Sequence, residues 1–570
     1  MNYCEYEITS NDYADFIMPN NVDLSRIEEA NEIVCTTEVD TIYSILYTIR
    51  SGRSDFMRFP YATVPSLYTL LDISSMVASG VTQTLVQPFL NSRGQGTMIG
   101  FIDTGIDYMN PLFLNTDGTT RILGIWDQTL TGGTATNTFV NYGREFTKEE
   151  IDNALKSENP LDVVPSEDRH GHGTFNAGIA AGNEAPEREF SGAAPDCSIC
   201  VVKLKPAKQY LRELYCIQDD AVAYQENDIL IAIRYLMNLA TEYGMPLVIY
   251  IGVGTNYGSH EGTSPLGITL RRINHMAGVT TVVPAGNETG LGSHYEGNFT
   301  QNQSFEDVEL RVGGNENGLV IQLWAAPPET YSVGFISPLG RVIERVPVNY
   351  QTATVINFIL EDTEIVVYYG ISEFGSGSSY VYMRFKNPTP GIWKIRVFNR
   401  LSVSGRYHMW IPIDGFITNN TYFINSNPNT IVTEPGNASE AITVGVFNHL
   451  NNSLYFRSSR GYNRVGVVKP DLVAPGVGIV GPGLRPSYSN DVFPMTSQTG
   501  ASVAAAHVAG AVAILMTWGI VNRNRMNMTT ATIKSILIRG ADRNPAIEYP
   551  NREWGYGTIN LYQSFLRLTD

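Results

Sequence analysis

The sequence predicts an α/β protein in which helices flank a parallel sheet, and three observations support this fold class. Continuous apolar runs of strand length recur along the chain, as in strands that are buried on both faces. A helical pattern lies between two of these runs, which is typical of a strand-helix-strand unit. A long stretch with strand-like runs and no convincing long helix interrupts this pattern, which predicts an inserted β-sandwich, jelly-roll-like in type.

The expected strands of the parallel sheet all end in Gly, Asp or Pro, and they are Met98 to Ile102, Ile199 to Leu204, Leu247 to Ile251 and Thr280 to Val283. The helix between the second and third strands has apolar residues at helical spacing, namely Ile229, Leu230, Ile233, Leu236 and Ala240. Gly244 follows as a C-terminal stop. This part of the chain therefore predicts one complete strand-helix-strand unit.

The inserted β-sandwich is expected over residues 296–412. Its strand-like runs include Val308 to Val312, Leu319 to Trp324, Thr354 to Leu360, Ile365 to Tyr369, Val381 to Phe385 and Trp393 to Phe398. The α/β pattern then resumes with a strand from Ala441 to Val446 and helices from Ser502 to Met516 and from Thr530 to Arg539. We therefore expect one α/β domain made of residues 73–295 and 413–570, preceded by a separate mixed segment, residues 1–72.

Net charge excludes two classes of partner. The chain has 39 Lys and Arg against 56 Asp and Glu, a formal charge of -17. This is the wrong sign for binding phosphate backbones or anionic lipid, so we expect no nucleic acid partner. The longest apolar run, Val503 to Trp518, contains His507 and is too short to cross a bilayer, so we expect a buried helix and no membrane span.

The N-terminus, MNYCEYEITSNDYADF, lacks the basic start and the apolar stretch of a secretory signal. The five cysteines form no disulfide framework in a chain of this length, and an odd count fits a reducing compartment. Both observations favour an intracellular location. Cys197 and Cys200 have metal-like spacing but no second pair to complete a zinc site, so no metal is assigned to them.

Three segments place a reactive side chain beside glycines at the end of a strand or the start of a helix, where α/β sheets hold ligands. The first two contain an aspartate and a pair of histidines. Asp103 follows a buried strand in the run Ile-Asp-Thr-Gly, which also fits a solvated turn. His170 and His172 precede a helix start in His-Gly-His-Gly-Thr. These two histidines also fit a metal pair or a polar loop.

The third such segment, Thr-Gly-Ala-Ser-Val-Ala-Ala-Ala-His, places Ser502 at the start of an apolar helix. On its own this serine suits a helix N-cap better than a nucleophile. Asn287, in Pro-Ala-Gly-Asn-Glu after a buried strand, is a common turn residue. Its side-chain amide also suits the oxyanion of a tetrahedral intermediate.

Together these segments resemble the subtilase family, whose members are subtilisin-like serine proteases. The chain order Asp, His, Ser is the subtilisin order. The resemblance includes Asp-Thr-Gly at 103–105, His-Gly-Thr at 172–174, the Ser502 segment and Ala-Gly-Asn-Glu around Asn287. It extends to Lys-Pro-Asp-Leu-Val-Ala-Pro-Gly at 469–476 and Trp-Gly-Tyr-Gly-Thr-Ile-Asn at 554–560, and so covers residues 80–565 without the insertion.

The resemblance implies a serine endopeptidase with Asp103, His172 and Ser502 as its triad and Asn287 in the oxyanion hole. It selects His172 over His170. The expected substrate-binding residues are Gly252, Gly254, Thr255, Pro284, Ala285 and Gly286. Ala501, Val503 and Ala506 stand where the family usually has Thr, Met and Pro, which leaves the rate in question but removes no reacting group.

Residues 1–72 have the size of a subtilase prodomain, which acts as an intramolecular chaperone and inhibitor. Gly80 to Gln83 and Ser92 to Gly96 resemble the start of the mature enzyme, so we expect self-cleavage near Leu70 to Ile73. The expected partners are a protein or peptide substrate and the chain's own prodomain. No cofactor is expected for catalysis. Calcium is common in the family, but no site is assigned.

The prodomain length and the β insertion resemble the clostridial germination-specific, Csp-type subtilases. That resemblance implies a bacterial, intracellular or spore-associated enzyme that activates a spore-cortex hydrolase zymogen. The alternative is a non-catalytic subtilase-like receptor or scaffold in germination, because some members of that group have lost triad residues. A carbohydrate-binding protein built on the insertion is a third alternative and needs an exposed aromatic platform.

Overall fold

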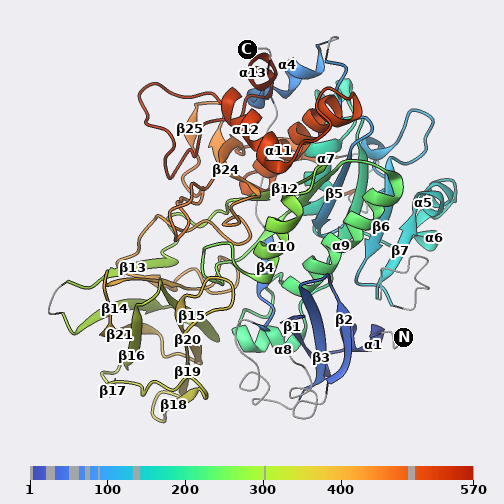
Figure 1. Cartoon of the computed structure of the whole chain (residues 1–570). Helices are drawn as coiled ribbons and strands as arrows, with labels where there is room; N and C mark the ends of the chain where they lie inside the picture. The colour runs from blue at the N-terminus through green and yellow to red at the C-terminus, as the bar shows by residue number, and fades with distance from the viewer. Residues whose placement is uncertain are drawn as a thin grey trace.

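A nine-stranded sheet carries the expected strands and extends across the upper half of Figure 1. The computed structural model describes residues 4–20, 33–50, 63–70, 77–87, 90–131, 142–300, 303–485 and 494–568. The strand order is β25-β24-β12-β10-β5-β8-β6-β7, with β26 beside β24. All pairs are parallel except β6 with β7 and β24 with β25. The bounds are β5 Met98–Asp103, β6 Ile122–Asp127, β7 Arg144–Thr147, β8 Ser198–Lys203, β10 Leu247–Ile251, β12 Val279–Pro284, β24 Ile442–Asn448, β25 Ser453–Leu454 and β26 Leu472–Pro475.

Helices cover both faces of this sheet, which is why its strands are apolar at successive positions. In β10, Val248 and Tyr250 join one core with α7 (His172–Ala181) and α11 (Ala501–Met516). The alternate residues of β10 join a second core with α9 (Glu226–Tyr243) and α10 (Pro265–Asn274). The fold class is thus the expected subtilisin-like α/β arrangement. The other helices are α1 Glu5–Thr9, α4 Val81–Leu85, α5 Lys148–Leu155, α6 Pro160–Val163, α8 Gln209–Tyr215, α12 Thr530–Gly540 and α13 Leu561–Leu566.

Two antiparallel sheets lie between β12 and β24 in the sequence and occupy the lower left of Figure 1. One has the order β13-β22-β15-β20-β19-β18 and the other β17-β16-β21-β14-β23. Apolar residues of both sheets form a single core. The bounds are β13 His294–Asn298, β14 Phe305–Val312, β15 Gly318–Ala325, β16 Thr330–Ile336, β17 Val342–Ile343, β18 Thr354–Phe358, β19 Thr363–Gly370, β20 Ser379–Lys386, β21 Gly391–Leu401, β22 Arg406–Trp410 and β23 Tyr422–Phe423.

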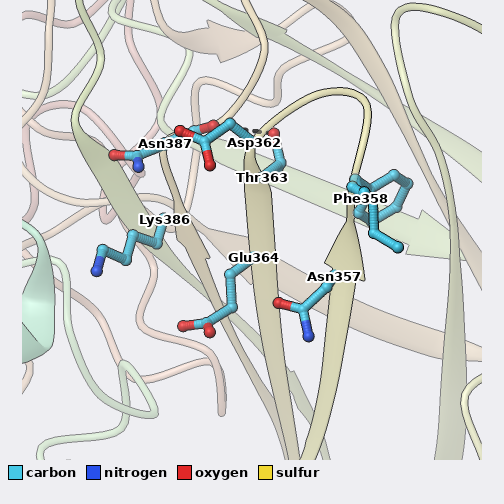
Figure 2. A pocket seen from close by; sticks show the side chains of 8 residues that line it. Asn357, Phe358, Asp362, Thr363, Glu364, Lys386 and Asn387 are labelled. Atoms are coloured by element: carbon cyan, nitrogen blue, oxygen red, sulfur yellow. Dashed lines mark hydrogen bonds between the residues drawn. The ribbon is translucent and has the colours of Figure 1, made fainter.

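One expected strand of this region is too long. The apolar run from Thr354 includes Ile359 and Leu360, but β18 ends at Phe358. Ile359 and Leu360 are 83% and 90% exposed and belong to the turn before β19. The prediction followed hydrophobicity alone and therefore placed the end of the strand two residues too late. A pocket of about 420 Å³ opens beside this turn, lined by Asn357, Phe358, Asp362, Thr363, Glu364, Lys386 and Asn387 among others (Figure 2). None of the expected site residues lines it.

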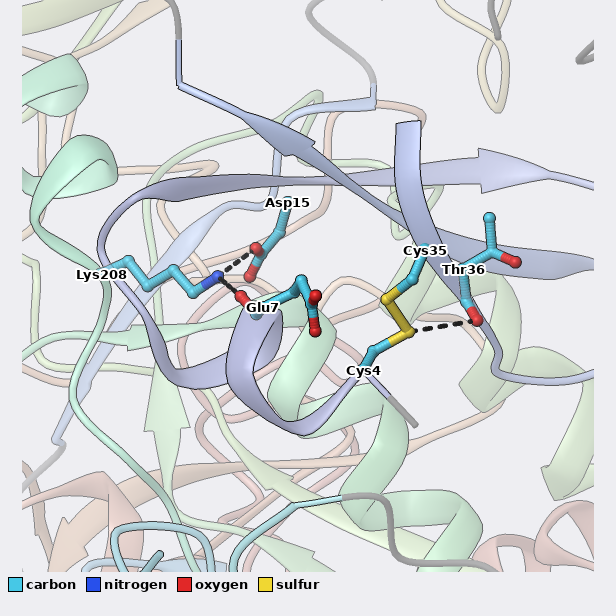
Figure 3. The surroundings of a disulfide bond; sticks show 6 residues. All are labelled: Cys4, Glu7, Asp15, Cys35, Thr36 and Lys208. Carbon is cyan, nitrogen blue, oxygen red and sulfur yellow. Dashed lines mark hydrogen bonds and ion pairs between the residues drawn. A yellow bond between two sulfur atoms is a disulfide. The ribbon is translucent and has the colours of Figure 1, made fainter. Parts of the chain in front are cut away.

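The N-terminal segment forms a three-stranded antiparallel sheet of order β1-β3-β2. The strands are β1 Tyr13–Pro19, β2 Ile33–Glu38 and β3 Tyr43–Ile49. A disulfide joins Cys4, which precedes α1, to Cys35 in β2 (Figure 3). The expectation of no disulfide framework did not foresee this bond, because the cysteine count does not show that these two residues become neighbours. Cys197, Cys200 and Cys216 are free and buried.

A fourth apolar core joins the N-terminal sheet, the segment around α8 and the inserted sheets. It contains Phe16 and Leu46 from the N-terminal sheet, Leu211 from α8, and Trp324 and Tyr382 from the insertion. Beside it, Lys208 Nζ lies 2.5 Å from Asp15 Oδ1 and donates to the Glu7 carbonyl at 2.6 Å (Figure 3). The three parts of the chain are thus packed against one another through shared apolar and ionic contacts.

Candidate active site

Asp103 is the last residue of β5, at the carboxyl end of the sheet, and its side chain is fully buried. Its Oδ1 accepts the Thr104 N–H at 2.7 Å, which helps hold the carboxylate in place. Gly252 provides the space beside it, because a Cβ at that position would lie 2.1 Å from Asp103 Oδ2. Gly252 was expected to bind substrate, and in the structure it adjoins the buried acid.

His172 is the first residue of α7, and Asp168 organises the turn that precedes it. Asp168 Oδ1 accepts the N–H groups of His170 and Gly171 at 3.0 and 2.9 Å. Its Oδ2 accepts both the N–H and the hydroxyl of Thr174 at 2.8 Å each. One buried carboxylate thus satisfies N–H groups at the start of the helix and sets its direction. No role was predicted for Asp168 from the sequence, although it lies in the same motif.

Ser502 is the second residue of α11, a helix whose residues are all buried. The Tyr250 hydroxyl donates to the Ser502 carbonyl at 2.9 Å, which ties the helix start to β10. The serine side chain and N–H lie at the positive end of the helix dipole. The polar start of an otherwise apolar helix is therefore held against the sheet.

The structure brings Asp103, His172 and Ser502 together. His172 Nδ1 lies 2.7 Å from Asp103 Oδ1, and His172 Nε2 lies 3.0 Å from Ser502 Oγ. A carboxylate only accepts hydrogen bonds, so Nδ1 carries the proton and Nε2 presents its lone pair to the serine hydroxyl. Asn176, one turn along α7, lies beside the imidazole, with Nδ2 3.2 Å from His172 Nδ1. His170 lies outside this set of contacts and bonds Asp168 through its backbone.

Asn287 lies in the turn after β12, next to the start of α11. Its Oδ1 accepts the Ala501 N–H at 3.1 Å, and its side chain is nearly buried. This hydrogen bond identifies the oxygen end of the amide, so Nδ2 is the end left to donate. An amide donor beside the Ser502 backbone is the arrangement that stabilises an oxyanion.

A three-stranded antiparallel sheet of order β11-β4-β9 includes Gly254, one of the residues expected to bind substrate. Its strands are β4 Leu67–Leu70, β9 Tyr224–Gln225 and β11 Val253–Gly254. Gly254 pairs with Thr69 and Val253 with Leu70. The last described residues of the N-terminal segment therefore lie as a strand between β11 and β9 of the α/β domain. Residues 71–73 of the expected cleavage region fall outside the described residues.

The other expected substrate-binding residues lie in two segments that contact the adjacent residues Thr433 and Glu434. Thr255 exchanges backbone hydrogen bonds with Glu434, at 2.9 and 2.8 Å. Ala285 accepts the Thr433 N–H at 2.9 Å, and a Cβ on Gly286 would lie 2.7 Å from the Thr433 methyl group. Pro284 ends β12, directly before Ala285. Thr433 and its neighbour Glu434 thus connect the two segments. No local sequence pattern pointed to Thr433.

Among the residues that the structure describes, no group of three or more His, Cys, Asp or Glu side chains is arranged to hold a metal ion. Cys197, directly before β8, and Cys200, within β8, are both buried. Burial raises the pKa of the Cys197 thiol to about 11. Over the described part of the chain, one helical stretch, Ala501–Val521, is long and apolar enough to span a membrane by composition, and 89% of its most apolar window is buried in the protein.

The model of the subtilase family matches residues 94–304 and 417–557. The Clostridium perfringens CspB protease is 29% identical, with a TM-score of 0.75, over 86% of this chain and 97% of that chain. Fervidolysin from Fervidobacterium pennivorans, a keratinolytic enzyme related to subtilisin, is 13% identical, with a TM-score of 0.47, over 97% of this chain and 61% of that chain. The unmatched residues between the two matched segments contain β14 to β22.

Proposed function

This chain belongs to the subtilase family and is a serine endopeptidase, and from that premise we propose that Asp103, His172 and Ser502 are its catalytic triad. The observation that carries the proposal is the pair of contacts made by His172, 2.7 Å to Asp103 and 3.0 Å to Ser502. Subtilases need no cofactor for catalysis. The side chains of the protein alone supply the chemistry.

In the proposed reaction, Ser502 Oγ attacks the scissile carbonyl carbon while His172 Nε2 takes the hydroxyl proton. The C–N bond then breaks, His172 returns the proton to the leaving amine, and an ester to Ser502 remains. Water attacks this ester by the same route and releases the acid. Asp103 keeps the imidazole oriented and stabilises its charged form. The Ser502 N–H and Asn287 Nδ2 donate to the oxyanion of each tetrahedral intermediate.

Labelling with a fluorophosphonate tests the triad directly. The purified protein should be labelled once, at Ser502, and both Ser502→Ala and His172→Ala should lose the label. A peptide library digested in parallel then reports the preferred residue before the cut. If the folded wild-type protein is not labelled and cleaves no peptide, the chain is a non-catalytic receptor or scaffold.

We also propose that residues 1–72 are a prodomain that the enzyme removes from itself. The support is the position of β4, which pairs with β11 and β9 as a bound peptide strand would. Glu226 adds two hydrogen bonds to Ser66, through its N–H at 3.0 Å and its carboxylate at 3.3 Å. N-terminal sequencing should find a new terminus shortly after Leu70 in the wild type and an intact chain in Ser502→Ala. Identical termini would contradict self-cleavage.

The finer role we propose is activation of a spore-cortex hydrolase zymogen by an intracellular or spore-associated enzyme. The support is the likeness to the Clostridium perfringens CspB protease over nearly the whole of that chain. Incubation of a purified cortex hydrolase zymogen with the wild type should release one shortened product that has hydrolase activity. Ser502→Ala should release none. A zymogen that stays intact beside an enzyme that cleaves peptides would point to another substrate.

A further inference from the structure

The turn that carries Asn287 is held by a loop far away in the sequence, residues 457–459. Ser459 Oγ accepts the Glu288 N–H at 3.0 Å, and the Ser459 N–H donates to the Gly286 carbonyl at 3.0 Å. The Arg457 carbonyl accepts the Thr289 N–H at 3.2 Å. The backbone on both sides of Asn287 is therefore anchored to this loop.

Arg457 makes the contact to Asn287 itself. Its Nε donates to the Asn287 carbonyl at 3.0 Å, and its Nη2 lies 2.6 Å from Asp414 Oδ2. Asp414 follows β22, the last strand of the six-stranded inserted sheet before the chain returns towards β24. One guanidinium thus joins the proposed oxyanion residue to the segment that follows β22, between the two inserted sheets' last strands.

The charges around the turn show why a cation suits this position. Glu288, next to Asn287, is buried, and its carboxylate accepts the Asn256 amide at 2.9 Å. Burial and the nearby Asp414 raise the pKa of Glu288 to about 7. The charge of Arg457 acts in the opposite direction and lowers the pKa of Glu288. Without the guanidinium, two carboxyl groups would face each other beside the oxyanion turn.

We propose that Arg457 is a positioning residue for the hydrolysis reaction, which holds Asn287 at the oxyanion and is itself held by Asp414. This inference rests on the proposed triad and oxyanion hole. Arg457 touches neither substrate nor reacting atoms in this role, so its effect reaches the transition state only through Asn287. The segment between β22 and β23 of the insertion is thereby coupled to the rate of the chemical step.

Kinetics of Arg457→Met and Asp414→Asn test the proposal on a peptide that the wild type cleaves. A small displacement of a transition-state donor lowers kcat more than it raises KM, so Arg457→Met should lose about 10-fold in kcat with KM within about 2-fold. Asp414→Asn should lose less, and Arg457→Lys should recover part of the rate. Arg396→Met is the matched control, because Arg396 also makes an ion pair to a carboxylate, Asp307, within the insertion.

The double variant with Asn287→Ala separates positioning from general destabilisation. Loss of an oxyanion donor costs about 100- to 1,000-fold in kcat. If Arg457 acts through Asn287, adding Arg457→Met to Asn287→Ala should cost no more than about 2-fold further. An equal 10-fold loss in both backgrounds, or a wild-type rate in Arg457→Met, would overturn the inference. A wild type that neither labels nor cleaves would refute the proposed function instead.

Discussion

At the scale of single residues, the proposed catalytic side chains depend on neighbours that take no part in the proposed reaction. Asp168 holds the turn before His172 through its two carboxylate oxygens. Gly252 makes room for Asp103, and Asn176 lies against the imidazole. Each neighbour restricts where a reacting atom can sit. Placement within fractions of an ångström is what distinguishes a triad from three polar residues.

Gly252→Ala tests this dependence. The added Cβ would lie 2.1 Å from Asp103 Oδ2, so the carboxylate must shift away from His172. We expect kcat to fall about 100-fold, because a misplacement of about 1 Å can cost that much. The control is Gly314→Ala, since a Cβ there meets nothing within 4 Å. Steady-state kinetics measure both, and a Gly252→Ala enzyme with the wild-type kcat would contradict the role.

At the scale of elements, β13 and β22 meet through a pair of buried histidines. His294 Nε2 lies 3.0 Å from His408 Nδ1, and both rings stack against Trp410. The His294 Nδ1 group faces the Asn427 carbonyl at 3.3 Å. One proton between two neutral rings satisfies this geometry. The pairing of these strands thus favours neutral imidazoles.

Acid should therefore destabilise this strand pair. Burial, and then the charge of His260, lower the pKa of His294 from 6.5 to about 3. Between these values the unfolded chain binds more protons, so the free energy of unfolding falls as the pH is lowered. We expect a loss of roughly 2–3 kcal/mol between pH 7 and pH 4.5 from this residue. Urea unfolding of Ser502→Ala gives the reference.

In the same Ser502→Ala background, His294→Gln should show a smaller loss of stability between the two pH values. The glutamine cannot titrate, although its amide can still donate and accept hydrogen bonds. His275→Gln is the control, because His275 ends α10 outside this cluster. If His294→Gln and the reference lose the same stability, the histidine pair does not set the acid sensitivity.

At the scale of the whole molecule, the N-terminal segment, the protease part and the insertion share one apolar core. The Asp15 and Lys208 ion pair lies beside this core, and both side chains are buried. Gln225 and Asn227 also donate to Asp15 Oδ2, at 2.9 and 3.2 Å. Gln225 belongs to β9, which pairs with β4. One carboxylate of the N-terminal segment thus contacts β9, the strand that pairs with β4.

Asp15→Ala should weaken this association. Removing one partner leaves Lys208 buried without its counter-charge, which typically costs about 3–5 kcal/mol. Urea unfolding of the uncleaved Ser502→Ala protein measures the loss. The double change Asp15→Leu with Lys208→Met should recover much of it, because an apolar pair of similar size avoids the unpaired charge. If Asp15→Ala in the Ser502→Ala background unfolds at the same urea concentration as Ser502→Ala itself, the ion pair contributes little to stability.

Much of the fold could be predicted from the sequence, because the sheet strands are short apolar runs whose period is local. The predicted strand Leu247 to Ile251 has the bounds of β10, and the predicted helix from Ser502 differs from α11 by one residue. The prediction missed β16, whose residues Thr330–Ile336 include Ser332 and Gly334. Strands with small or polar residues owe their stability to the neighbours they pair with, which a local pattern does not reveal.

The sequence by itself determined the α/β class, the inserted β region and the residues with the chemistry of a serine protease, because each depends on a local pattern or motif. Only the tertiary structure decided which distant residues support them. Gly252 beside Asp103, Arg457 on Asn287 and the core shared by three parts of the chain are contacts between segments far apart in sequence. Such contacts arise from packing in three dimensions and leave no periodic signal along the chain.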